Sequence, residues 1–164
     1  MSPQLRRLAK AASAISLLPL LCAFGGGDKT STERRDANRF ILEKLNRQAG
    51  EGWQRSGQFF LWSYTFSRDG CELTISRTAV QGGELVRQTV PIADVVPVWQ
   101  GGPSVALYCQ ATTDCIQLDT KGGSHDDSVK IGDTSVLAPQ PDDLPKIADA
   151  FGELHRLCDD AYGR

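Results

Sequence analysis

Two closely spaced cysteines, Cys109 and Cys115, constrain the fold of this chain more than any other feature of its sequence. The five residues between them exceed the spacing of a usual zinc clip and of a Cys-x-x-Cys redox motif. This spacing suits a hairpin loop, because directly opposed residues of antiparallel strands have Cα atoms close enough for a disulfide. We therefore predict a structural Cys109–Cys115 disulfide between two paired strands.

The first 27 residues predict that these cysteines reach an oxidising compartment. Three basic residues, Arg6, Arg7 and Lys10, precede the apolar run 11–24, which is the order of a secretory signal peptide. The run is shorter than the roughly 20 residues of a membrane span, and a retained anchor is one alternative. Lipidation at Cys22 is the other, although leucines precede it where small residues are usual. We expect a periplasmic or secreted protein with no membrane span after cleavage.

Four cysteines remain after cleavage, and cysteines outside the cytosol form lasting disulfides. Four cysteines allow three pairings. Cys71 is expected on the apolar face of a strand and Cys158 on the apolar stripe of the last helix, so we predict a second disulfide between them. Two free buried thiols are the alternative for this pair.

The charge and length of residues 28–164 limit the classes of partner. This segment has fifteen basic and twenty acidic side chains, a net charge of −5. Such a balance disfavours nucleic acids, which bind clustered positive charge, and anionic membrane surfaces. The length suits one domain with its own core. The sequence therefore predicts a signal peptide over 1–27 and a single domain over 28–164.

Two amphipathic helices are predicted near the ends of this domain. Thr30 and Glu33 have the pattern of a capping box, and apolar residues then recur at helical spacing as far as Ala49. Asp142 and Asp143 are expected to begin the second helix, where carboxylates satisfy unpaired amides. Six residues form the apolar stripe of the second helix: Leu144, Ile147, Ala148, Phe151, Leu154 and Cys158.

The Asp69-Gly70 pair is a strong hairpin signal, because it lies between two stretches of alternating apolar and polar residues. A two-residue turn there pairs Tyr64 with Ile75 and places Cys71 on the apolar face. One apolar face and one polar face are typical of an antiparallel sheet.

Further strands are predicted downstream of this hairpin. A turn over 81–84 pairs Val80 with Leu85. An irregular connector is expected over 93–104, because proline and glycine are frequent there. The remaining elements are strands at 104–109, 115–119 and 134–138, a weaker strand at 128–131, and a loop over 120–128.

Together these elements predict an α+β fold: an N-terminal helix, an antiparallel meander of five to seven strands curled into a roll, and a closing C-terminal helix. A curled meander whose open end is filled by a C-terminal helix resembles the pleckstrin-homology-like roll. Roughly the last 75 residues also resemble small exported bacterial proteins of unknown function. The matching residues are 92–95, Cys109, Cys115-Ile116 and 151–158. This resemblance implies no catalytic residues.

Aromatic residues are the main candidates for binding, since the sequence contains no phosphate-loop, dinucleotide or nucleophile-elbow motif. Trp99 lies in the predicted connector, and Tyr108 is expected to point outward because its neighbour Cys109 points inward. Exposed aromatic side chains are frequent at binding surfaces. The alternative for Trp99 is a lid folded over the open end of the roll.

The two histidines, His125 and His155, are further candidates for site residues. His125 stands beside Asp126 and Asp127, a combination that suits a metal or a general base, and a solvated loop is the alternative. His155 is expected in the last turn of the second helix, where a positive charge suits the helix dipole. We keep His125 as a third binding candidate and assign no catalytic residue, metal ligand or cofactor.

The function expected from these features is an exported, non-enzymatic binding domain for a protein or a small ligand of the cell envelope. One alternative is an inhibitor or immunity-type protein that blocks an enzyme with the loop 110–114 or 121–128. Another is a small hydrolase that uses His125.

Overall fold

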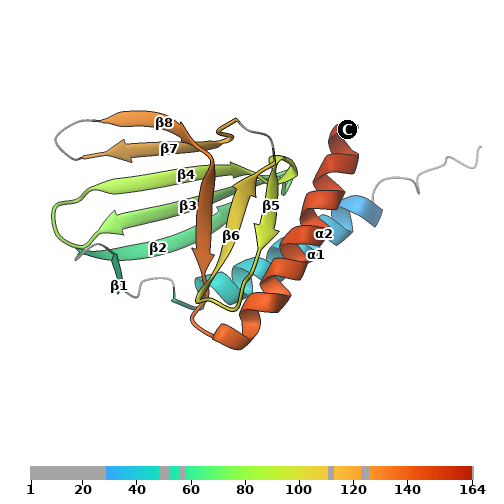
Figure 1. Ribbon diagram of the computed structural model, residues 1–164, viewed down its shortest axis with the longest axis horizontal. Coiled ribbons are helices and arrows are strands. Elements are labelled where there is room, and N and C mark those ends of the chain that lie inside the picture. The colour runs from blue at the N-terminus through green and yellow to red at the C-terminus, as the bar shows by residue number, and fades with distance from the viewer. Residues whose placement is uncertain (1–28, 49–51, 56–57, 111–112, 123–125, 164) are drawn as a thin grey trace, which may run out of the picture.

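Two antiparallel sheets and two long helices form the part of the chain that the computed structural model describes (Figure 1). The described residues are 29–48, 52–55, 58–110, 113–122 and 126–163. The predicted signal peptide and His125 lie outside them. The arrangement confirms the predicted α+β class, with a helix before the strands and a helix after them.

The larger sheet has the strand order β1-β2-β3-β4-β7-β8, and the smaller sheet has the order β5-β6-β9. The larger sheet consists of β1 (Gly52–Arg55), β2 (Gln58–Phe66), β3 (Glu72–Ala79), β4 (Leu85–Pro91), β7 (Ile116–Lys121) and β8 (Asp127–Ile131). The smaller sheet consists of β5 (Val95–Val98), β6 (Ser104–Cys109) and β9 (Asp133–Leu137). The helices are α1 (Lys29–Leu45) and α2 (Leu144–Tyr162), and the short 3-10 turns are η1 (Asn46–Gln48), η2 (Ile92–Asp94) and η3 (Pro141–Asp143).

The β2–β3 hairpin has the predicted register, with Tyr64 opposite Ile75. Its turn is closed by a hydrogen bond of 3.0 Å from the Gly70 amide to the Ser67 carbonyl. The apolar face of the hairpin is buried as predicted, through Phe60, Trp62, Tyr64, Leu73 and Ile75. The alternation of the sequence therefore positions this pair of strands correctly.

The register between β3 and β4 differs from the predicted one by two residues. Leu85 pairs with Thr78 and not with Val80. The Ala79 amide donates to the Glu84 carbonyl at 2.8 Å, so the loop covers residues 80–84 and is longer than predicted. Because side chains alternate with a period of two, this shift leaves each side chain on its predicted face.

The predicted irregular connector contains a strand. β5 pairs with β6, with Val96 opposite Tyr108. Pro97 is tolerated because β5 is at the edge of the smaller sheet, where a missing N–H need not serve a second strand. The weaker predicted strand at 128–131 is present as β8, and β1 was not predicted, so the described residues contain nine strands against the five to seven predicted.

The predicted hairpin around Cys109 and Cys115 is wrong, although the disulfide between them is present. β6 lies between β5 and β9, whereas β7 lies between β4 and β8. The chain therefore passes from one sheet to the other between the two cysteines, whose Cα atoms are 5.8 Å apart. The described strands form two sheets and no closed barrel.

The inner faces of the two sheets meet in one core, and Figure 1 shows the strands of the smaller sheet crossing those of the larger one steeply. Hydrogen bonds join the faces at two places: Thr134 Oγ1 donates to Gln88 Oε1 at 2.7 Å, and the Tyr64 hydroxyl accepts from the Leu137 amide at 3.2 Å and donates to the Leu137 carbonyl at 3.5 Å. The largest fully buried side chains come from both helices, both sheets and η2: Ile41, Leu45, Tyr64, Leu73, Ile75, Ile92, Leu107, Ile116, Leu144, Ile147, Phe151 and Leu154.

Both helices pack together on one side of the sheets (Figure 1). Thr30 lies inside α1 and not before it, so the predicted capping box is wrong. Asp143 precedes α2 as predicted, but its side chain caps no amide. Its buried carboxylate instead contacts Lys44 of α1 at 3.3 Å and Arg47 of η1 at 3.4 Å, because the end of α1 and the turn after it lie beside the start of α2. The carboxylate therefore ties the two helices together.

The Cys71–Cys158 disulfide is formed as predicted. Cys71 lies directly before β3, Cys158 lies near the end of α2, and both are buried. Their Cα atoms are 5.6 Å apart. This bond therefore fastens the last helix to the β2–β3 hairpin.

Candidate functional site

A groove of about 670 Å³ lies between the edge strand β5 and the helix α2. Figure 1 shows α2 running beside β5. One wall is supplied by Val96, Pro97 and Trp99, and the other by Pro145, Ala148, Asp149, Gly152, Glu153 and His155. The groove therefore has an apolar wall on the strand side and a more polar wall on the helix side.

Trp99 follows β5 directly and lines the groove with its side chain 39% exposed. Its indole Nε1 donates to the Gly102 carbonyl at 3.0 Å, so the polar edge of the ring is satisfied within its own loop. The indole is therefore not folded into the core as a lid. A large aromatic ring held in one orientation beside a groove is well suited to contact another molecule.

Tyr108 points outward, because the alternation of β6 buries its neighbour Leu107. It is 45% exposed, and its cross-strand partner Val96 is 42% exposed. Directly opposed residues of antiparallel strands project to the same face. Tyr108 and Val96 therefore form an apolar patch next to the groove, on the outer face of the smaller sheet.

His155 was expected in the last turn of α2, but it lies about two turns before the helix ends at Tyr162. Its Nδ1 donates to the Ile92 carbonyl at 3.0 Å, which leaves Nε2 to accept a hydrogen bond from Gln110 Nε2 at 2.9 Å. His155 thus connects α2 to η2 and to the end of β6, and it forms one end of the groove. Its role in the described structure is to position these elements.

Two carboxylates line the helix side of the groove. Glu153 pairs with Arg156 at 2.6 Å, and this hydrogen bond lowers the pKa of Glu153 and raises the pKa of Arg156. Asp149 makes no ion pair with any residue that the structure describes. The charge of Asp149 is therefore available to a cation bound in the groove.

Gly152 leaves the middle of the helix wall open. A Cβ added at this position would have no atom within 4 Å. The missing side chain therefore adds depth to the groove, and a larger residue could be placed there without displacing the protein's own atoms.

The acidic loop next to His125 is organised by its own backbone as far as the structure describes it. Asp126 accepts a hydrogen bond from the Gly122 amide at 3.2 Å, and Asp127 accepts one from the Ser128 amide at 2.8 Å. Among the residues that the structure describes, no group of three or more His, Cys, Asp or Glu side chains is placed to hold a metal ion. The described carboxylates of this loop therefore stabilise the β7–β8 hairpin.

Sequence reasoning missed Val96, Asp149 and Gly152 as groove residues. The valines on either side of Pro97 are a strand signal that the proline obscured. Asp149 and Gly152 belong to the outer side of an amphipathic helix, and no local pattern places that side next to β5. Their position depends on tertiary packing.

Comparisons with protein-family models, with curated proteins and with solved structures find no match for this chain. The resemblances to a pleckstrin-homology-like roll and to small exported proteins therefore stay predictions. Neither helix in the described part of the chain is long and apolar enough to cross a membrane.

Proposed function

We propose that this chain is an exported binding domain that acts without catalysis and receives a segment of a partner protein in the groove between β5 and α2. The observation that carries the proposal is the half-exposed Trp99 indole beside a groove of about 670 Å³. Tryptophan and tyrosine are the residues most enriched at the energetic centres of protein interfaces, because their rings bury a large apolar area.

The walls of the groove indicate the chemistry of the partner segment. An apolar side chain of the partner would pack between Trp99 and Val96, which removes apolar surface from water. A lysine or arginine next to it would face Asp149, which has no cation of its own among the described residues. The proposed partner segment therefore pairs an apolar residue with a basic one.

Tyr108 extends this surface beyond the groove. It projects from the outer face of the smaller sheet beside Val96, on the strand next to β5. A partner segment longer than the groove would cover the Tyr108 ring as well. Loss of the Tyr108 ring should therefore weaken binding less than loss of the Trp99 ring.

Export is the second part of the proposal. It is supported by the order of basic and apolar residues in 1–27 and by two disulfides, which persist in oxidising compartments. After expression with its own leader, the intact mass of the protein outside the cytosol should correspond to a chain shortened near residue 27. A full-length chain that stays in the cytosol with reduced cysteines contradicts export.

The test of binding is a selection from a random peptide library displayed on phage, with the exported and oxidised protein as target. We expect enriched peptides with adjacent apolar and basic residues, whose affinity is then measured by calorimetry with synthetic copies. Trp99→Ala should weaken this binding at least tenfold. Gly152→Phe should also weaken it, because the new ring fills the groove.

Phe59→Ala is the matched control, since Phe59 is 55% exposed on β2, away from the groove residues. This variant should bind the selected peptides as tightly as the unmodified protein. Peptides that bind Trp99→Ala as tightly as the unmodified protein would contradict the proposed site. A selection without any enrichment would contradict the proposed partner class.

A further inference from the structure

A second cleft, of about 710 Å³, lies between α1 and the turn that joins β2 to β3. Its charged lining residues are four arginines and two carboxylates: Arg34, Arg35, Arg39, Arg68, Glu43 and Asp69. The whole chain, by contrast, has a net charge of −2. A concave surface with an excess of positive charge concentrates anions, even on an acidic protein.

Ion pairs within the protein neutralise only part of this charge. Arg39 pairs with Asp36, and Glu43 contacts Arg47 at 3.4 Å. Three lining arginines make no ion pair with any described residue: Arg34, Arg35 and Arg68. No described carboxylate neutralises their charge, so this charge attracts an external anion.

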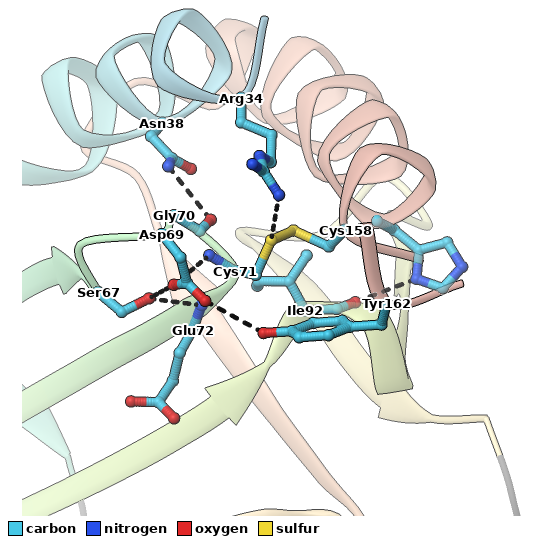
Figure 2. The surroundings of a disulfide bond; sticks show 11 residues. Arg34, Asn38, Ser67, Asp69, Gly70, Cys71, Glu72, Ile92, Cys158 and Tyr162 are labelled. Carbon is cyan, nitrogen blue, oxygen red and sulfur yellow. Dashed lines mark hydrogen bonds between the residues drawn. A yellow bond between two sulfur atoms is a disulfide. The ribbon is translucent and has the colours of Figure 1, made fainter. Parts of the chain in front are cut away.

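The Asp69 carboxylate is engaged by donors other than these arginines (Figure 2). It accepts hydrogen bonds from the Ser67 hydroxyl at 2.5 Å, the Cys71 amide at 3.2 Å and the Tyr162 hydroxyl at 3.1 Å. The Ser67 bond contributes most to lowering the pKa of Asp69, and the Cys71 bond contributes next. Asp69 therefore serves the turn and does not pair with Arg68.

Two buried atoms of the lining side chains have no hydrogen-bond partner among the described residues, Arg34 Nε and Asn38 Oδ1. Asn38 is only 9% exposed, and its Nδ2 donates to the Gly70 carbonyl at 3.2 Å (Figure 2). Leaving a buried polar atom unpaired costs free energy, and native proteins rarely do so. Arg34 Nε requires an acceptor and Asn38 Oδ1 requires a donor, so a ligand with both groups would complete the cleft.

The wall that carries these atoms is held in place before any ligand arrives. Gly70 has φ +81°, and a Cβ there would overlap Asn38 Nδ2, so α1 approaches the turn as closely as glycine allows. Arg34 points toward the Cys71–Cys158 disulfide, with Nη1 3.7 Å from Cys71 Sγ (Figure 2). A preorganised site loses less conformational freedom on binding, which favours affinity.

We propose that this cleft binds a small hydroxylated oxyanion. Its carboxylate or phosphate group would lie between Arg34, Arg35 and Arg68, and its hydroxyl would donate to Asn38 Oδ1. The planar guanidinium group is suited to either oxyanion, because two of its N–H groups match the spacing of two ligand oxygens.

The test is calorimetric titration of the oxidised protein with citrate and with glycerol 1-phosphate, against sodium chloride at matched ionic strength. Saturable binding of at least one probe is expected, and it should weaken as sodium chloride is added, since salt screens exposed charges. Arg68→Glu should weaken binding at least tenfold, whereas Arg68→Lys should weaken it less. Arg87→Gln, at an exposed arginine on β4, is the matched control and should have no effect.

The hydroxyl is tested separately by comparing citrate with tricarballylate, which has the same carboxylates and no hydroxyl. Citrate should bind several-fold more tightly, and equal affinities would overturn the role of Asn38. Arg68 is exposed in the turn, so the melting temperature of Arg68→Glu without ligand should match that of the unmodified protein. The site itself is overturned if neither citrate nor glycerol 1-phosphate binds, or if Arg68→Glu binds them unchanged.

Discussion

The Cys71–Cys158 disulfide joins residues that are 87 positions apart, whereas the Cys109–Cys115 disulfide joins residues that are six apart. The Cα distances are nearly the same, 5.6 and 5.8 Å. The long connection fastens the last helix to the β2–β3 hairpin, and the short one closes the passage between the two sheets. Bonds of similar geometry therefore restrict the unfolded chain very differently, because loop-closure entropy grows with loop length.

The surroundings of the two disulfides differ as well. Cys71 and Cys158 are fully enclosed in the core, but Cys109 and Cys115 are half-buried. The passage between the sheets also has backbone support, since the Cys109 amide donates to the Gly132 carbonyl at 2.8 Å. The long-range disulfide should therefore matter more for global stability, and the short one mainly for local order.

Removing the long-range disulfide should have the largest effect. Cys71→Ala combined with Cys158→Ala should lower the free energy of unfolding by about 4 kcal/mol or more, from loop entropy and lost core packing. Urea denaturation measures this difference. If this loss were no larger than the loss caused by removing the short disulfide, the long-range disulfide would not be the more important one for global stability.

The turn before Cys71 gives the next largest effect. Gly70→Ala should cost about 2–3 kcal/mol, because alanine is strained at positive φ and its Cβ would overlap Asn38. Gly82→Ala is the matched control, since Gly82 also has positive φ but an added Cβ there has no atom within 4 Å. Equal losses in the two variants, measured by urea denaturation, would show that the close approach of α1 to the turn contributes nothing.

Removing the short disulfide should cost less. Cys109→Ala combined with Cys115→Ala should lower the free energy of unfolding by about 2 kcal/mol, the loop-entropy value for so short a connection. Hydrogen exchange should increase at the Cys109 amide and leave β2 and β3 unchanged. Faster exchange throughout the core of the larger sheet would contradict a purely local role.

The smallest effect is expected from the charge of Asp69 in the β2–β3 turn. Hydrogen bonds from Ser67 and the Cys71 amide lower the pKa of Asp69 below its ordinary value, so its contribution is present above pH ~4 and is lost as pH falls through the lowered pKa. The carboxylate is mostly exposed, which limits this contribution to less than about 1 kcal/mol. Asp69→Asn should reduce the acid dependence of unfolding slightly, and an unchanged pH profile would contradict this role.

Both disulfides could be predicted from the sequence, but the structure confirms the reasoning behind only one of them. The prediction for Cys71 and Cys158 depends on the apolar face to which each belongs, and those faces do meet in the core. Cys109 and Cys115 were paired because their spacing suits a hairpin, yet a passage between two sheets brings them equally close. Local spacing predicts the bond, but only non-local strand pairing decides which sheet each strand joins.

The binding surfaces were less predictable than the fold. The outward direction of Tyr108 follows from strand alternation, which is a local property. The groove requires α2 to lie beside β5, and the basic cleft requires Arg34 on α1 to meet Arg68 in a distant turn. In the sequence alone Arg34 belongs to a solvated helix face, because no local pattern indicates what lies opposite.

The connectivity of the cysteines in the protein purified without reductant tests the central claim most directly. Trypsin would place Cys71 in 69–77, Cys158 in 157–164, and both Cys109 and Cys115 in 88–121. Mass spectrometry without reductant, after blocking of thiols, should find 69–77 joined to 157–164 and 88–121 closed on itself with no blocked cysteine. Blocked cysteines in the folded protein, or 69–77 joined to 88–121, would contradict the account.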